Sequence, residues 1–193
     1  MNACESILGL SPYQGGKPIE ELARELGLKK ISKLASNENP LGVSTKVQKA
    51  INDSLSSLNR YPDGNCFELK EAIAKKHNVS SSMISLGNGS NELLELIARV
   101  FVSKQSDEII FSQYAFVVYP LVTQALGATA LVSPATNFGH DLNATLSLIT
   151  KHTTLIFVAH PNTPTGPLLM DEAVYNCIKQ IPSLTIFKGN FFS

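Results

Sequence analysis

The stretch TLIFVAHPNTPTG, residues 154–166, decides the fold that the sequence predicts. Its first part, Thr154–Ala159, is apolar enough and short enough to be a buried strand. A polar loop with a histidine, an asparagine and two threonines follows at once. Because Pro161 and Pro164 restrict the backbone, this loop suits a positioned side chain better than a free linker. We therefore expect a core strand followed by a rigid loop that positions the side chain of Asn162.

The alternation of strand and helix continues on both sides of this stretch. Short apolar runs that indicate strands alternate with amphipathic runs that indicate helices. The predicted strands are 83–86, 108–111, 129–133, 154–159 and 184–187, and the predicted helices between them are 91–102, 116–127, 142–149 and 171–181. Crossovers of this kind predict an α/β fold with a mainly parallel sheet and helices on both faces.

The chain before the first of these strands is helical and rich in loops. Three helices are predicted, at 18–28, 44–55 and 67–77, with Gly27 ending the first and Ser44 capping the second. We expect residues 1–43 to form an N-terminal arm with the first helix and residues 44–193 to form the main domain.

Composition and charge exclude several classes of protein. Lys and Arg together number 16, as do Asp and Glu, so the net charge of zero gives no reason to expect a nucleic-acid partner. Three scattered cysteines provide neither a metal-binding spacing nor a disulfide framework. We see no signal peptide and no apolar run of the length that a membrane span needs. The expectation is a cytoplasmic protein without a metal or a membrane partner.

The predicted strand at 83–86 is followed by a stretch rich in glycine and polar residues. The sequence GNGSNE (87–92) places two glycines before Ser90 and Asn91, which open a helix whose free N–H groups can bind a phosphate. The alternative is a simple turn with Ser90 as an N-cap, and spacing alone favours it. The sequence matches neither of the usual nucleotide-binding glycine motifs.

The aromatic and amide side chains also allow two interpretations. Phe116, near the start of a helix, could lie flat on a planar ligand or could simply pack in the core. Asn162 could donate a hydrogen bond to a ligand oxygen or could only stabilise its own loop. Because ligands bind beyond the carboxyl ends of strands in open α/β sheets, we predict that Ser90, Asn91, Phe116 and Asn162 surround one cavity.

Six motifs, in this order, resemble the N-terminal half of the histidinol-phosphate aminotransferase family. They are SPYQGGKP (11–18), ASNENPLG (35–42), NRYPDG (59–64), LGNGSNE (86–92), AFVVYP (115–120) and HPNTPTG (160–166). The family belongs to the fold type I transferases that depend on pyridoxal 5'-phosphate (PLP). The resemblance runs from about residue 10 to about residue 181 and implies an incomplete large domain of that fold.

The resemblance implies roles for seven residues. Those in the PLP site would be Ser90 and Asn91 (cofactor phosphate, through their backbone N–H groups), Phe116 (stacking on the cofactor ring), Asn162 (hydrogen bond to the phenolic oxygen) and Tyr61 (cofactor phosphate of the other subunit of a homodimer). Tyr13 and, more weakly, Asn37 would contact substrate. The implied reaction is amino transfer between L-histidinol phosphate and 2-oxoglutarate in histidine biosynthesis.

The sequence departs from the family pattern at its end. Asn190 stands roughly where the family has the aspartate that holds the ring proton of PLP. The lysine of a Ser-x-x-Lys motif, which would form the Schiff base, is absent, and Lys188 lies in a different setting. No catalytic residue is therefore assigned, and the chain is expected to be truncated and inactive alone. The alternatives are a non-catalytic remnant and a related PLP enzyme, either an aromatic aminotransferase or a threonine-phosphate decarboxylase.

Overall fold

The computed structural model describes residues 4–34, 36, 38–181 and, for the backbone alone, 185–189. The chain divides into two compact units. One combines Met1–Tyr13 with Gly87–Ser193, and the other is Gln14–Leu86. The division into an N-terminal arm of residues 1–43 and a main domain of residues 44–193 remains a prediction.

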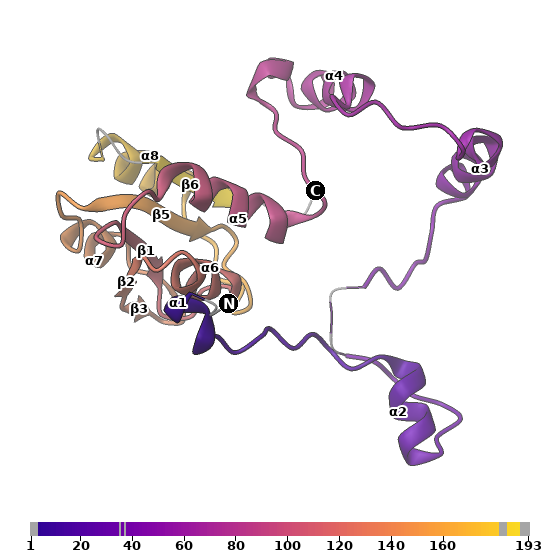
Figure 1. Cartoon of the computed structure of the whole chain (residues 1–193), viewed down its shortest axis with the longest axis horizontal. Coiled ribbons are helices and arrows are strands. Elements are labelled where there is room, and N and C mark those ends of the chain that lie inside the picture. The colour runs from indigo at the N-terminus through magenta and orange to yellow at the C-terminus, as the bar shows by residue number, and fades with distance from the viewer. Residues whose placement is uncertain (1–3, 35, 37, 182–184, 190–193) are drawn as a thin grey trace. The chain divides into compact units, whose positions relative to one another are not determined.

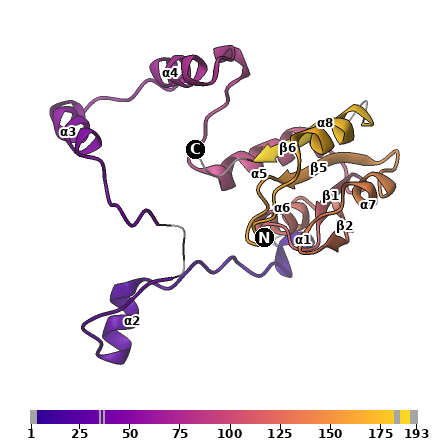
Figure 2. The ribbon, with the colours of Figure 1, turned by 180° about the vertical axis from the view of Figure 1, so that it is seen from behind.

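The larger unit is built on a parallel sheet. Its strands are β1 (Glu108–Ser112), β2 (Thr129–Ser133), β5 (Thr153–Ala159) and β6 (Thr185–Gly189). Their order across the sheet is β2-β1-β5-β6, and each neighbouring pair is parallel (Figures 1 and 2). The predicted mainly parallel sheet is confirmed.

Helices cover both faces of this sheet. They are α5 (Ser90–Phe101), α6 (Val118–Ala125), α7 (Leu142–Ser147) and α8 (Asp171–Lys179). Successive strand residues point to opposite faces, so Ile109 and Phe157 pack with α5 and α6, whereas Ile110 and Ile156 pack towards α7 and α8. The uninterrupted apolar runs in the sequence follow from this burial on both faces.

Helix α5 runs against the direction of the strands. After its last turn the chain enters β1 through a tight connection, in which Asp107 accepts backbone hydrogen bonds from Ser103 (2.7 Å) and Lys104 (2.9 Å). These bonds hold the pKa of the Asp107 carboxyl below its usual range. Figures 1 and 2 show α5 entered from the side towards which the arrow of β5 points. The first turn of α5 therefore lies at the carboxyl edge of the sheet.

A small hairpin that the sequence did not predict lies between β2 and α7. Strands β3 (Ala135–Thr136) and β4 (Gly139–His140) pair antiparallel around Asn137 and Phe138, which have positive φ angles of 50° and 61°. Two-residue strands are too short to show a hydrophobic period. A side chain added at Gly139 would meet Pro167 Cβ at 3.1 Å, so the hairpin packs closely against the loop after β5.

The remaining helices lie in the N-terminal segment of the larger unit and in the smaller unit. Helix α1 (Glu5–Leu8), also not predicted, contacts α6. The smaller unit contains the three predicted helices: α2 (Ile19–Leu26), α3 (Thr45–Ser54) and α4 (Phe67–His77), with short 3-10 turns at Leu55–Ser57 and Ser81–Met83.

The predicted strand at 83–86 is wrong. Residues 81–83 form a 3-10 turn, and residues 84–86 have no ladder partner. The hydroxyl of Ser80 accepts a hydrogen bond from Ser82 N (3.3 Å), and such local bonds compete with strand formation. Four apolar residues alone do not make a strand when no neighbouring strand pairs with them.

Candidate functional site

The carboxyl edge of the sheet brings together the first turn of α5 and the loops after β1 and β5. All three segments belong to the larger unit. In the sequence they contain Ser90 and Asn91, Phe116, and Asn162, so these predicted residues share one edge of one unit.

The first turn of α5 is open to an anion. Gly89 precedes the helix with φ 90° and ψ 167°, and no side chain caps the helix start. The backbone N–H groups of Ser90 and Asn91 donate to no described residue. Free N–H groups at a helix N-terminus, with the helix dipole behind them, favour a phosphate or a carboxylate. Gly87 is also tightly placed, because a Cβ there would meet Leu93 Cγ at 2.9 Å.

Phe116 lies two residues before α6 and is half-buried. Its ring meets the ring of Tyr119 edge-on, with centroids 6.1 Å apart and planes at 88°. Tyr119 is fully buried, and burial raises its pKa to about 12. The hydroxyl of Tyr119 has no hydrogen-bond partner among the described residues. The buried ring of Tyr119 therefore packs against the ring of Phe116.

Asn162 is buried and hydrogen-bonded within the protein. Its Nδ2 donates to the carbonyl oxygen of Tyr114 (3.2 Å) and to the hydroxyl of Thr165 (2.6 Å). The Oδ1 atom is buried and has no partner among the described residues. Backbone bonds from Asn162 N to Pro167 O (3.1 Å) and from Gly166 N to Asn162 O (2.8 Å) close the loop. The stiff loop predicted from the two prolines is thus also tied together by the asparagine.

Two histidines that the sequence analysis left without a role flank the end of β5. His160 is buried, and its Nδ1 accepts a hydrogen bond from Leu169 N (3.1 Å). His140 Nε2 lies 2.7 Å from the carbonyl oxygen of Ala159 and donates to it. Burial lowers the pKa of His140, and nearby His160 adds to the effect against the opposing hydrogen bond to Ala159. Both rings therefore fasten the backbone at the start of the loop.

The remaining predicted residues lie elsewhere or outside the described residues. Tyr61 belongs to the smaller unit and its side chain is exposed. Tyr13 ends the N-terminal segment of the larger unit and is also exposed. Asn37 and Asn190 lie outside the described residues, as does the side chain of Lys188.

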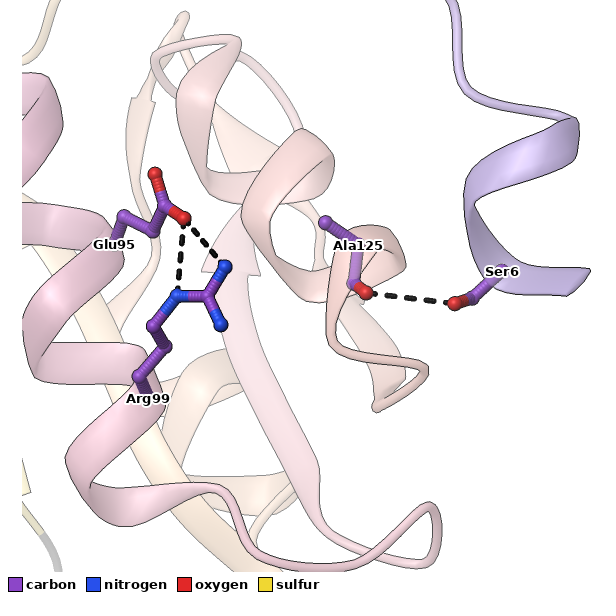
Figure 3. A network of polar contacts seen from close by, with 4 residues as sticks. All are labelled: Ser6, Glu95, Arg99 and Ala125. Carbon is purple, nitrogen blue, oxygen red and sulfur yellow. Dashed lines mark hydrogen bonds and ion pairs between the residues drawn. The ribbon is translucent and has the colours of Figure 1, made fainter. Parts of the chain in front are cut away.

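Two cavities in the larger unit are lined by other residues. The larger, about 450 Å³, lies between the β3–β4 hairpin, α7 and α8 and contains none of the predicted site residues. The smaller, about 190 Å³, lies among the N-terminal segment, α5 and α6. Figure 3 shows polar contacts of three residues that line it: Ala125 O accepts from the hydroxyl of Ser6 (3.4 Å), and Arg99 pairs with Glu95 (2.7 Å). Arg99 is already paired there, so the cavity offers an anion no free cation.

Neither a metal centre nor a membrane span is found in the described part of the chain. No group of three or more potential metal ligands occurs among those residues. None of the helices there combines the length and the apolar character needed to cross a bilayer.

Two curated relatives have about half of the aligned residues identical to those of this chain. It is 55% identical over 176 residues to histidinol-phosphate aminotransferase 1 of Mannheimia succiniciproducens, covering 91% of this chain and 48% of that protein. It is 52% identical over 184 residues to histidinol-phosphate aminotransferase 2 of Haemophilus influenzae, covering 95% of this chain and 50% of that protein. The chain spans about half the length of these relatives.

Solved structures of aminotransferases have the same fold. Histidinol-phosphate aminotransferase from Sinorhizobium meliloti, solved in complex with PLP, superposes with a TM-score of 0.83 at 22% identity, covering 95% of this chain and 49% of that one. Aspartate aminotransferase from Thermus thermophilus, solved with maleate, gives a TM-score of 0.82 at 18% identity, covering 97% and 53%. These likenesses confirm an incomplete large domain of the PLP-dependent transferase fold. A family model for aminotransferase class I and II matches residues 29–180, and the chain belongs to that family.

Proposed function

We propose that this chain supplies part of the cofactor site of a histidinol-phosphate aminotransferase, which transfers an amino group from L-histidinol phosphate to 2-oxoglutarate. The observation that carries the proposal is the uncapped first turn of α5 at the same sheet edge as Phe116 and Asn162. The identity of 55% to a curated histidinol-phosphate aminotransferase supports the choice of substrate. The proposed setting is histidine biosynthesis in the cytoplasm.

The residues at this edge fit PLP in two respects. The free N–H groups of Ser90 and Asn91 suit its phosphate, and the half-buried ring of Phe116 suits a planar pyridine. PLP, when bound, supplies an electron sink for the carbon that exchanges its amino group. The chain's own residues would bind the phosphate, orient the ring and exclude water from one side of it.

Asn162 fits this proposal only after a local change. It would donate to the phenolic oxygen of the cofactor, but both of its amide hydrogens already serve Tyr114 and Thr165. One of those bonds would have to open for Asn162 to reach a ligand.

These 193 residues alone are proposed to bind PLP without a covalent bond. No Ser-x-x-Lys sequence occurs within them. In the complete assembly we propose a homodimer, in which exposed Tyr61 reaches the cofactor phosphate of the other subunit and Tyr13 and Asn37 contact substrate.

Titration of the chain with PLP, followed by cofactor fluorescence and visible circular dichroism, tests the proposal. We expect saturable binding that inorganic phosphate competes away and that borohydride does not make permanent. The variant Gly87→Ala should weaken binding, because its Cβ would press on Leu93 at the start of α5. Gly64→Ala is the matched control, since a Cβ at Gly64 meets no atom within 4 Å. Absence of saturable binding, or equal binding by both variants, would reject the assigned phosphate site.

A further inference from the structure

We propose that Asn162 and Thr165 are positioning residues that fasten the loop after β1 and the turn of the β3–β4 hairpin to the loop after β5. The effect on the Phe116 ring, and through it on PLP, rests on the proposed function. The fastening itself does not, because it consists of contacts within the protein. We refer to these hydrogen bonds, from Asn162 to Tyr114 and Thr165 and from Thr165 to Phe138, as the Asn162–Thr165 link.

The directions of the hydrogen bonds in this link are fixed by chemistry. Thr165 Oγ1 lies 2.7 Å from the carbonyl oxygen of Phe138, which can only accept. The hydroxyl therefore donates its single hydrogen to that oxygen. The same hydroxyl must therefore accept from Asn162 Nδ2, 2.6 Å away. The other amide hydrogen meets a second obligate acceptor, the carbonyl oxygen of Tyr114 at 3.2 Å. Turning the amide over would set its oxygen against that carbonyl, so only one orientation of Asn162 satisfies both neighbours.

The link spans long distances in the sequence and is buried at its centre. Asn162 is 48 residues from Tyr114, and Thr165 is 27 residues from Phe138. Asn162 is only 2% exposed, so water does not readily replace its partners. The buried amide of Asn162 and the hydroxyl of Thr165 together join three separate segments of the chain.

Packing around the link ties the same three segments. The rings of Tyr114 and Phe138 lie with centroids 5.3 Å apart. On the other side, the backbone of Gly139 approaches Pro167 so closely that an added Cβ would lie 3.1 Å from the proline ring. Asparagine tolerates the positive φ angle of Asn137, but the positive φ angle of Phe138 is unfavourable for a bulky residue, and such conformations persist where the surroundings hold them. The hydrogen bond to Phe138 O is one such restraint.

The link reaches the candidate site through a short piece of backbone. Phe116 follows Tyr114 by two residues and begins the turn into α6, where Tyr119 N donates to Phe116 O (3.0 Å). On the other side of Tyr114, Ala115 N donates to Ser112 O (3.0 Å) at the end of β1. Releasing the Tyr114 carbonyl would therefore loosen the segment that carries the Phe116 ring.

Amide hydrogen exchange on the ligand-free chain tests the fastening. In Thr165→Val, which keeps the shape but loses the hydroxyl, exchange should quicken by roughly three- to tenfold in both 112–117 and 136–140, the effect of losing about one net hydrogen bond. Asn162→Asp should behave in the same way although it fills the same space, because a carboxylate cannot donate. Thr165→Ser should match the wild type, since it keeps the hydroxyl.

Thr163→Val is the matched control, because the Thr163 side chain makes no hydrogen bond to a described residue. It should leave exchange in both segments unchanged. Faster exchange confined to 160–167 in Thr165→Val, or equal effects of Thr163→Val and Thr165→Val, would overturn the proposal.

A second measurement separates the fastening from the proposed function. If the wild type binds PLP, Thr165→Val should retain binding through the α5 phosphate site but should lose most of the circular dichroism induced in the cofactor, because the Phe116 ring is less fixed. An unchanged induced signal would reject the effect on Phe116. If the wild type binds no PLP, the proposed function fails, while the exchange experiment still decides whether the link holds the three segments.

Discussion

The ring of Tyr119 lies flat against the ring of Phe157, with centroids 4.5 Å apart and planes only 6° apart. This stack joins α6 to β5, and Phe157 in turn pairs in register with Phe111 of β1. The ring of Tyr119 also contacts the ring of Phe116, with the two planes at 88°. The stack therefore connects the centre of the sheet to the candidate cofactor site.

The buried hydroxyl of Tyr119 gives the first prediction. It has no hydrogen-bond partner among the described residues, and an unsatisfied buried hydroxyl costs about 1–3 kcal/mol. Tyr119→Phe keeps the stack and removes the hydroxyl, so the free energy of unfolding in urea should stay equal or rise by about 1 kcal/mol. A loss of stability would mean that the hydroxyl has a partner in solution.

The attachment of α5 to the sheet gives the second prediction. Leu94 is fully buried against the face that holds Tyr119 and Phe157. Leu94→Ala should lower the free energy of unfolding by about 2–5 kcal/mol, as buried leucine truncations do. Leu96→Ala on the exposed side of the same helix should cost far less, because Leu96 is 47% exposed. Equal losses in the two variants would contradict the observed packing of α5.

The third prediction concerns Asp107 and the stability of the fold at low pH. Backbone hydrogen bonds from Ser103 and Lys104 lower the pKa of Asp107, so the carboxylate stabilises the fold above its unfolded pKa of about 4 and loses this contribution as pH falls through its folded pKa. Asp107→Asn should therefore be less stable than the wild type at pH 7, with the difference shrinking below about pH 4. The measurement is the urea midpoint at several pH values.

The fourth prediction concerns His140 and the pH dependence of thermal stability. Burial lowers the pKa of His140 in the fold, so the unfolded chain takes up the proton first as pH falls. Its contribution to stability is complete above about pH 6.5 and declines as pH drops towards the folded pKa. His140→Gln, which can still donate to Ala159 O, should reduce the loss of thermal stability between about pH 7 and pH 5.5. An unchanged pH dependence would show that His140 does not titrate in this range.

Secondary structure could be predicted from the sequence where burial imposes a regular pattern of apolar residues. The apolar runs of β1 and β5 are continuous because both faces are covered, and the α5 and α8 patterns follow a single buried stripe. Those elements match the predicted ranges within a few residues. The hairpin at 135–140 shows no such period. Its turn also needs a positive φ angle at Phe138, which this residue type rarely adopts, although Asn137 beside it tolerates one.

The candidate site was predictable only in part for a similar reason. Parallel strands end at one edge, so the positions of Phe116 and Asn162 after two strands placed them in one region. Ser90 lies at the same edge for another reason, because α5 runs against the strands (Figures 1 and 2), whereas the strand predicted before it at 83–86 does not form. The partners of Asn162 could not be predicted, because they are a carbonyl oxygen 48 residues away and a hydroxyl whose direction depends on the hairpin. Backbone carbonyl groups leave no signal in a sequence.

The last prediction concerns Gly89, which opens α5 with φ 90° and ψ 167°. This region of backbone conformation is almost restricted to glycine, and a residue forced into it costs about 1–3 kcal/mol. A Cβ at Gly89 would meet no atom within 4 Å, so any effect of Gly89→Ala comes from the backbone and not from a clash. We expect the variant either to lose about that much stability in urea or to relax the first turn of α5, with weaker binding of PLP and inorganic phosphate. Gly64→Ala, which also adds a Cβ into open space but has no positive φ, should change neither stability nor binding. If Gly89→Ala binds phosphate and unfolds like the wild type, the conformation of Gly89 is not what opens the N–H groups of Ser90 and Asn91 to an anion.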